Sequence, residues 1–227
     1  MSKISEIVNL KNHPIIESEN YLKSCNNELI SNSILQLDDF LTNKGLSKIQ
    51  KEAVNLKKHA FYCSQKHTIL LNKINNKISS KDPCNLEVVS DKGCVPHDLI
   101  PKNSYLNLLY KSKYFKNFIA KTLGIKNIYP YSDKLSSINY NYYEKNQQLG
   151  WHFDNATFAI TLMIQSPKSG GIFEYTNKGR NYEKNYINKN YIKKVIKNKM
   201  KVEELKVRPG TLILFYGRNY LHRVTPV

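Results

Sequence analysis

Apolar residues in the first half of the chain recur every three or four positions, which is the spacing of one face of an α-helix. Between residues 17 and 80 they are Leu22, Leu29, Ile34, Leu37, Ala53, Leu56 and Ala60, with a break near residues 43–45. This pattern predicts two helices joined by a turn. Residues 81–103 contain several prolines and are predicted to be a loop. In "SKYFKNFIAKTLG" another helix is predicted between the N-cap Ser112 and Gly124.

After Gly124 the pattern changes to short runs rich in tyrosine, isoleucine and phenylalanine, which are separated by turn residues. The runs are "SSINYNYYE", "FAITLMIQ", "GIFEY", "VEELKV", "TLILFYG" and "LHRVTPV". Each run is predicted to be a β-strand, and Gly170, Gly171 and Gly210 are predicted to lie in turns between them. The lysine- and asparagine-rich residues 177–201 interrupt the series and are predicted to be a solvated helix or excursion on the rim.

Helices followed by many short strands predict an α+β protein, in which helices support one side of a sheet sandwich or jelly roll. We expect a single structural unit, because 227 residues suit one large domain. Residues 1–124 would form a mainly helical N-terminal support region. Residues 125–227 would form the sheet core, with the insertion near 177–201 on its edge.

The chain carries a formal net charge of +17, which raises the question of a nucleic-acid partner. The charge is mostly lysine scattered along the chain, with only four arginines, so specific nucleic-acid binding is not favoured. The first residues lack the apolar segment of a secretory signal, and no apolar run spans a bilayer, so we expect a cytoplasmic protein without membrane contact. The four cysteines show no C-x-x-C spacing and are expected to be free thiols.

The stretch "GWHFDN" places His152 and Asp154 two positions apart in a strand-like run. Alternate side chains of a strand share a face, so these two point the same way while Phe153 packs on the other face. An aspartate in a strand is costly to bury unless it is paired or bound to a metal. The alternative is an aspartate at a strand edge, forming a turn with Asn155.

A second histidine, His222, lies in the last predicted strand, 68 residues after Asp154. Strands that far apart in the sequence are often neighbours in a jelly roll. Two histidines and one carboxylate form the facial triad that holds non-haem Fe(II) and leaves coordination positions open. The pattern therefore predicts a metal site made by His152, Asp154 and His222.

At these residues the sequence resembles the 2-oxoglutarate and Fe(II)-dependent oxygenases, in a bacterial branch related to hydroxylases and radical halogenases of free amino acids. The resemblance covers roughly residues 105–227 and is most specific in residues 151–175 and 209–227. It implies a double-stranded β-helix core, Fe(II) held by the two histidines and the aspartate, 2-oxoglutarate as cosubstrate and dioxygen as oxidant. It also implies hydroxylation, because the halogenases of this branch replace the aspartate by a small residue.

This sequence differs from the pattern of the family at one point. Relatives carry a basic residue, usually arginine, on the strand after the distal histidine, where it pairs with the far carboxylate of 2-oxoglutarate. Only five residues follow His222, so we expect the last core strand to be missing and this truncated form to hold 2-oxoglutarate weakly. Arg223 should face away from the site, and Arg218 lies on the approach to the strand, so neither replaces the missing residue well. Arg218 is kept as a candidate cosubstrate contact.

Tyr140 and Tyr142 share a face of the preceding strand, where the resemblance implies cosubstrate contacts, but core packing is the simpler explanation of both side chains. Trp151 is predicted to be a wall of the core. The remaining histidines, His13, His59, His67 and His97, have no partner spacing and are expected at the surface or in loops.

We therefore expect an Fe(II)- and 2-oxoglutarate-dependent dioxygenase that hydroxylates an unactivated C–H bond of a small polar substrate such as a free amino acid. Two alternatives remain open from the sequence. One is a catalytically inert jelly-roll binding module, suggested by the missing arginine. The other is an oxygenase that acts on a protein or nucleic acid, suggested by the charge. The sequence leaves the substrate and the oligomeric state undetermined.

Overall fold

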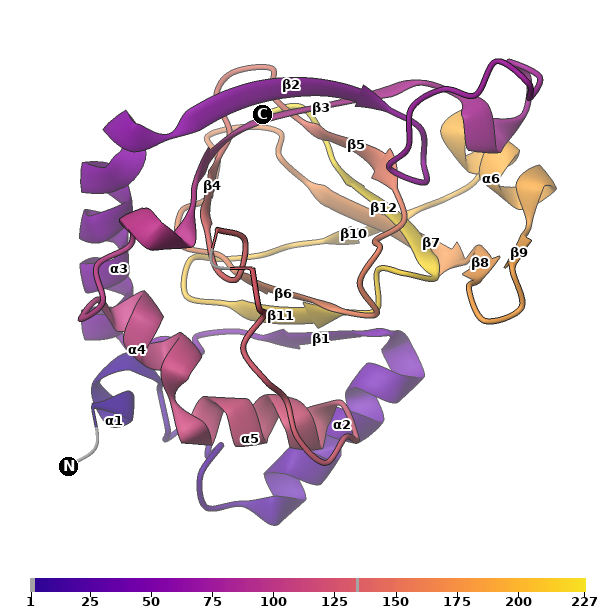
Figure 1. The fold of residues 1–227 in the computed structure, drawn as a ribbon. Helices are drawn as coiled ribbons and strands as arrows, with labels where there is room; N and C mark the ends of the chain where they lie inside the picture. The colour runs from indigo at the N-terminus through magenta and orange to yellow at the C-terminus, as the bar shows by residue number, and fades with distance from the viewer. Residues whose placement is uncertain (1–2, 134) are drawn as a thin grey trace.

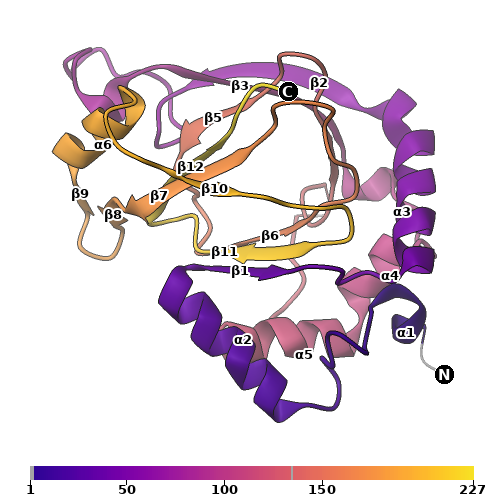
Figure 2. The same cartoon turned by 180° about the vertical axis from the view of Figure 1, so that it is seen from behind.

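The computed structural model of the chain describes residues 3–133 and 135–227. Six α-helices and twelve strands are present in these residues, with the first five helices on one side and two sheets beside them (Figures 1 and 2). The helices are α1 (Ile4–Ile7), α2 (Glu19–Asn32), α3 (Asn43–Leu56), α4 (Tyr105–Lys111), α5 (Lys113–Thr122) and α6 (Lys189–Ile196). Short 3-10 turns lie at Lys57–His59, Pro83–Asn85 and His97–Leu99.

The larger sheet has seven antiparallel strands in the order β10-β7-β12-β5-β3-β2, and β4 also pairs with β3. Its strands are β2 (Phe61–His67), β3 (Val88–Val95), β4 (Tyr140–Tyr142), β5 (Leu149–His152), β7 (Phe173–Lys178), β10 (Glu203–Leu205) and β12 (Tyr220–Val224). The smaller sheet has the order β1-β11-β6, made of β1 (Ile34–Leu37), β11 (Leu212–Phe215) and β6 (Ala159–Leu162). A separate hairpin joins β8 (Arg180–Asn181) to β9 (Tyr186–Ile187).

The two sheets face each other across an apolar layer. Ile34, Ile213 and Phe215 of the smaller sheet pack there against Phe173 and Tyr175 of the larger sheet. Alternate residues of the smaller sheet point the other way and pack in the main core with α2 and α5, so helices cover its outer face (Figure 2). This arrangement of helices on two facing antiparallel sheets confirms the predicted α+β jelly-roll class.

Local signals correctly predicted several elements. Ser112 caps α5 by accepting a hydrogen bond from the Phe115 N–H, and Gly124 follows the helix with a φ of 68°. Gly170 and Gly171 both have a φ of 63°, which suits their predicted place in a turn. All six runs predicted as strands after Gly124 contain strand residues. The predicted absence of the last core strand stays a prediction, and β6 is an edge of its sheet within the described residues.

The first half was predicted incorrectly in three places. β1 lies inside residues 17–80, which were predicted to be helical. The helical part of that range ends at the 3-10 turn Lys57–His59, and β2 follows it. β3 occupies part of residues 81–103, which were predicted to be a loop. The break expected near residues 43–45 is instead the start of α3, where the Thr42 hydroxyl accepts a hydrogen bond from the Gly45 N–H. These strands gain their stability from pairing with distant partners, since β1 pairs with β11 and β3 with β5, and pairing of that kind leaves a weak local signal.

The insertion near 177–201 forms β8, β9 and α6. α6 is a helix as predicted, but it is not solvated on all sides, because Ile192 and Val195 are buried against Trp151 and Phe153. The insertion therefore covers the outer face of β5. Within the described residues, no helix is long and apolar enough to cross a membrane.

Candidate metal centre

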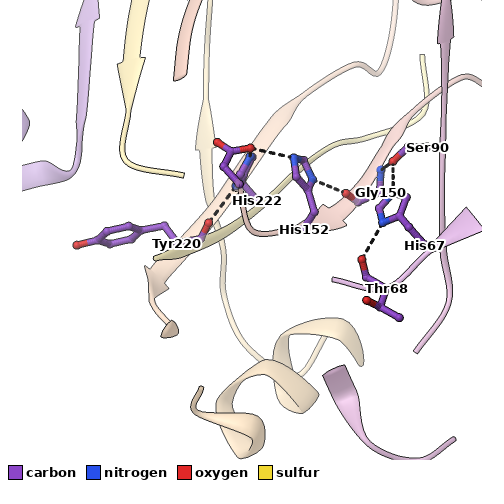
Figure 3. A network of polar contacts seen from close by, with 8 residues as sticks. His67, Thr68, Ser90, Gly150, His152, Tyr220 and His222 are labelled. Carbon is purple, nitrogen blue, oxygen red and sulfur yellow. Dashed lines mark hydrogen bonds and ion pairs between the residues drawn. The ribbon is translucent and has the colours of Figure 1, made fainter. Parts of the chain in front are cut away.

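Two neighbouring strands bring the distant histidines together. β5 and β12 are antiparallel partners, and His152 lies directly opposite His222 in their register. Residues opposite each other in such a pair point to the same face of the sheet. Asp154 follows β5 in a turn, where its N–H donates to the Gly217 carbonyl at 3.0 Å. The fold thus gathers the three predicted ligands, and Figure 3 shows the two histidines on their neighbouring strands.

The donor atoms of the triad converge on one point. Oδ1 of Asp154 lies 3.5 Å from Nε2 of His152 and 3.5 Å from Nε2 of His222. One ligand atom from each residue lies within 4.8 Å of the others. Both histidines are buried, with 4% of each exposed, so the surrounding protein shields the two rings from water. Separations of this size suit three ligands around one metal ion with bonds of about 2 Å.

Backbone carbonyls fix the orientation of both imidazoles. Nδ1 of His152 contacts the Gly150 carbonyl at 2.8 Å, and Nδ1 of His222 contacts the Tyr220 carbonyl at 2.9 Å (Figure 3). A carbonyl only accepts, so each Nδ1 carries the proton and each Nε2 of a neutral ring presents a lone pair to Asp154. This is the arrangement in which histidines commonly bind a metal.

The electrostatics of the triad favour a cation. Burial and then the neighbouring His222 lower the pKa of His152, which keeps its ring neutral. Oδ1 of Asp154 lies beside both Nε2 atoms, and a cation between them would hold this carboxylate in its ionised form. Its Oδ2 is buried without a hydrogen-bond partner in the described part of the chain. A buried, unsatisfied carboxylate oxygen next to two imidazole lone pairs fits a divalent metal ion.

Gly217 provides the space for the aspartate. A Cβ atom at this position would lie 1.8 Å from Oδ2 of Asp154 and 3.0 Å from Cε1 of His222. No φ in the left-handed region is involved, so the glycine is required for room and not for backbone conformation. This role was not predicted from the sequence, because Gly217 stands at the end of a strand run, where a turn glycine is ordinary.

A hydrogen-bond network lies behind His152. The Gly150 N–H donates to the Ser90 hydroxyl at 3.0 Å, and that hydroxyl lies 2.6 Å from Nε2 of His67 (Figure 3). Nδ1 of His67 contacts the Thr68 carbonyl at 2.8 Å, so His67 is protonated at Nδ1 and accepts at Nε2. The prediction that His67 lies at the surface or in a loop is wrong, since it is 7% exposed at the end of β2. Its position depends on the strand pairing of β2 with β3, which the sequence did not predict.

The sequence model described as HalD, halogenase D, matches residues 17–227. The chain belongs to the halogenase D family. The match begins further upstream than the predicted resemblance, which started near residue 105. No curated protein matches the sequence.

Solved structures share the fold at low sequence identity. A 2-oxoglutarate and Fe(II) oxygenase family oxidoreductase from Burkholderia pseudomallei has a TM-score of 0.56 at 13% identity, over 92% of this chain and 86% of that one. A prolyl-4-hydroxylase from Pseudomonas putida has a TM-score of 0.53 at 11% identity, over 91% and 92%.

A prolyl hydroxylase from Trichoplax adhaerens, in complex with a peptide fragment of the hypoxia inducible factor oxygen degradation domain, has a TM-score of 0.56 at 13% identity, over 96% and 86%. These likenesses show the fold of 2-oxoglutarate and Fe(II) oxygenases. The predicted resemblance to this oxygenase class is confirmed, and Fe(II), 2-oxoglutarate and dioxygen are the cofactors of the class.

The structure places the two candidate tyrosines beside α3. The Tyr140 hydroxyl donates to Oε1 of Glu52 at 2.7 Å, and the Tyr142 hydroxyl donates to the Ala53 carbonyl at 2.7 Å. Tyr140 is buried in the main core and Tyr142 packs against it. These contacts account for both side chains structurally, and their contact with a cosubstrate stays a prediction.

Neither arginine near His222 makes a hydrogen bond or ion pair with the triad within the described residues. Arg223 lies over the Trp151 ring at 4.7 Å and donates to Oε2 of Glu174 at 2.6 Å, on the face opposite His222, as predicted. Trp151 is buried, as predicted. Arg218 donates from Nε and Nη2 to the Asn155 carbonyl at 3.1 and 2.7 Å, so its guanidinium is held by the residue that follows Asp154.

Proposed function

We propose that the chain is an Fe(II)- and 2-oxoglutarate-dependent dioxygenase that hydroxylates an unactivated C–H bond of a small polar substrate, specifically a free amino acid or a similar molecule. His152, Asp154 and His222 are the metal ligands. One oxygen atom of dioxygen enters the substrate C–H bond to give an alcohol, and the other enters 2-oxoglutarate, which loses carbon dioxide and becomes succinate, with Fe(II) supplying the redox chemistry.

The convergence of three donor atoms from two paired strands is the observation that carries this proposal. Oδ1 of Asp154 is 3.5 Å from both imidazole nitrogens, and Oδ2 has no hydrogen-bond partner among the described residues. An ion pair or a turn aspartate would leave no such buried oxygen unsatisfied. A metal ion accounts for both features.

The residues around the triad have separate tasks. The carbonyls of Gly150 and Tyr220 hold the two Nδ1 protons, so each Nε2 stays directed at the metal position. Phe173 and Phe215 pack beside His222, with ring centroids 5.7 and 4.9 Å from it, and keep water from that side of the site. The ionised Asp154 offsets half of the charge of a divalent cation, which leaves a site that still attracts an anionic cosubstrate.

Asp154 favours hydroxylation over halogenation. The resemblance in the sequence implies that halogenases of this branch have a small residue at this position, which leaves a coordination position for halide. Here the carboxylate fills the position, and the missing Cβ at Gly217 makes room for it. The pair Asp154 and Gly217 therefore supports a carboxylate-bound metal.

The test is anaerobic Fe(II) loading followed by exposure to dioxygen with 2-oxoglutarate and a panel of free L-amino acids. We expect succinate to form, and one or more amino acids to stimulate it while gaining one oxygen atom by mass spectrometry. The Asp154→Ala variant should bind little Fe(II) and form no succinate. Full activity in that variant would contradict the assignment of the triad.

Halogenation is the second candidate, because the family model that matches the chain is named for a halogenase. The same assay in the presence of chloride separates the two outcomes, since a chlorinated product differs in mass and isotope pattern from an alcohol. We expect only the alcohol from the natural chain. A chlorinated product would show that Asp154 does not exclude halide.

A further inference from the structure

Positive charge is concentrated at one end of the molecule. The connection between β2 and β3 (residues 68–87) and the insertion at residues 177–201 together make up a fifth of the chain. They carry twelve lysine or arginine residues and three acidic residues, so they hold +9 of the net charge of +17. Lysines that are scattered along the sequence are thus gathered by the fold.

The two segments form one unit, called here the basic lobe. Ile69 of the connection is buried together with Ile192 and Val195 of α6. The Lys189 ammonium lies 2.6 Å from Oδ2 of Asp82, and Figures 1 and 2 both show α6 beside the connection. Among the cations of the lobe that the structure describes, only Lys189 has an ion-pair partner. The other cations of the lobe therefore remain available to an external anion.

The connection also exposes aliphatic side chains. Every residue from 71 to 81 is exposed, and Leu71, Ile74 and Ile78 have 36, 44 and 42% of their surface exposed. Three lysines alternate with them in this stretch, "LNKINNKISSK". Large aliphatic side chains are unfavourable in water, so three of them on one loop indicate a surface that meets an apolar phase.

A buried side chain fixes the shape of this loop. Asn85 is 4% exposed, and its amide donates to the carbonyls of Asn75 and Ile78, both at 3.0 Å. Its Oδ1 accepts from the Asn75 N–H at 2.8 Å. At the start of the connection, the Ile69 carbonyl accepts from the Phe153 N–H at 2.8 Å. The exposure of the aliphatic side chains therefore belongs to a defined conformation, held at both ends of the loop.

We propose that the basic lobe binds the surface of an anionic lipid membrane, with Leu71, Ile74 and Ile78 among the headgroups and the lysines on the lipid phosphates. Apolar side chains interleaved with lysines suit the membrane interface, where buried apolar area and electrostatic attraction both contribute to binding. Such binding needs no apolar run that spans a bilayer, so the sequence-based expectation of no membrane contact does not extend to this surface. The proposal is independent of the proposed function.

The side chains of the lobe favour a lipid surface over a nucleic acid. Nucleic acids are bound by stacking of bases on free aromatic rings and by arginines that contact base edges. Arg180 is the one arginine of the lobe, and it lies 5.7 Å from the ring centroid of Phe153 and 4.8 Å from that of Tyr182. Arg218 also lies over Tyr182, at 4.4 Å. Arg180 and Tyr182 are thus engaged with each other, and leucine and isoleucine offer no stacking surface.

Vesicle flotation tests the proposal with the full chain. The vesicles consist of phosphatidylcholine alone, or of phosphatidylcholine and phosphatidylglycerol in equal parts, and each is used at low and at high salt. We expect binding to the anionic vesicles at low salt. Binding to phosphatidylcholine alone, or to either vesicle at high salt, should be about tenfold weaker or worse, because the attraction of lysines to anionic lipid is screened by salt.

Two double variants separate the apolar part of the contact from the charged part. Ile74→Ser with Ile78→Ser removes apolar area at unchanged charge and should weaken binding to the anionic vesicles about tenfold. Lys73→Gln with Lys77→Gln should weaken it about 20-fold, because each lysine near an anionic surface contributes about fivefold.

Matched controls carry the same kinds of change elsewhere. Ile30→Ser with Val54→Ser removes side chains that are 64 and 66% exposed on α2 and α3. Lys48→Gln with Lys51→Gln removes two exposed lysines of α3, which lies on the opposite side of the molecule from the lobe (Figure 1). Both controls should bind the anionic vesicles within about twofold of the wild type, because charges far from the contact are screened.

Three results would overturn the proposal: no binding to anionic vesicles at low salt, wild-type binding by both loop variants, or equal losses in the loop variants and the controls. A nucleic-acid surface would give a different pattern. A DNA duplex would then bind about tenfold more tightly than the vesicles or better, and the isoleucine substitutions would affect neither ligand, which would reject the membrane.

Discussion

The sharpest test of the metal centre is the substitution Gly217→Ala. The new methyl carbon would lie 1.8 Å from Oδ2 of Asp154, whereas an ordinary contact needs at least 3.4 Å. One of the two groups must therefore move by at least 1.6 Å, the difference between these distances. Metal ligands tolerate a displacement of only about 0.2 Å. We expect Asp154 to leave its position and the affinity for Fe(II) to fall by about 100-fold, or about 2.7 kcal/mol.

The effect of Gly217→Ala on the free energy of unfolding should be modest, and it can be measured separately from the loss of Fe(II) affinity. Overpacking of a filled site costs about 1–3 kcal/mol, and part of this is relieved when the carboxylate turns outward. Gly93→Ala is the matched control, because its methyl would meet the ring of Tyr62 at 2.7 Å, and this partly exposed side chain is far from the triad in the sequence and is not a metal ligand. Urea denaturation of the metal-free proteins gives the folding cost, and anaerobic Fe(II) titration gives the affinity.

A double-mutant cycle completes the test. In an Asp154→Ala background the methyl of Gly217→Ala meets no carboxylate and only Cε1 of His222 at 3.0 Å, so its folding cost in urea denaturation of the metal-free protein should be smaller than in the wild-type background. The reasoning is refuted if Gly217→Ala alone binds Fe(II) within threefold of the wild type, or if its folding cost is the same in both backgrounds.

Three further predictions concern the surroundings of the site. Asp154→Ala should leave the metal-free protein as stable as the wild type or more stable, because a buried unsatisfied oxygen is removed, and it should abolish the rise in melting temperature caused by Fe(II). Ser90→Ala should weaken Fe(II) binding about tenfold or more by freeing the Gly150 peptide that orients His152, whereas Ser137→Ala, which removes a similar contact to His97, should not. Ile192→Ala should destabilise the fold by about 2–4 kcal/mol in thermal or urea unfolding without changing the Fe(II) affinity.

The sequence predicted the strands of the second half well because their own residues specify them. β-branched and aromatic runs bounded by glycine and proline mark β6, β7 and β11, and the alternation of His152 and Asp154 placed two side chains on one face. Strands of the first half are specified by distant partners. β2 and β3 carry many polar residues, and their pairing was visible only in the folded protein.

Some residues of the site could likewise be predicted from the sequence, and others could not. Side chains with their own chemistry, such as His222, could be assigned from residue type and spacing. Residues that act through shape or backbone could not. Gly217 leaves room for the Asp154 carboxylate, because a Cβ at this position would clash with it. Ser90 accepts a hydrogen bond from the N–H of Gly150, which is 60 positions away in the sequence.

The register of β5 and β12 has a consequence for how the protein moves. His152 and His222 are cross-strand partners, so an ion bound to both would act as a cross-link across that pair of strands. Such a link closes a loop of about 70 residues and lowers the entropy of any state in which the strands separate. Amide hydrogen exchange in β5 and β12 should therefore slow on Fe(II) loading, and exchange in β1 should respond much less. Metal occupancy would then set the lifetime of the native sheet as well as its chemistry.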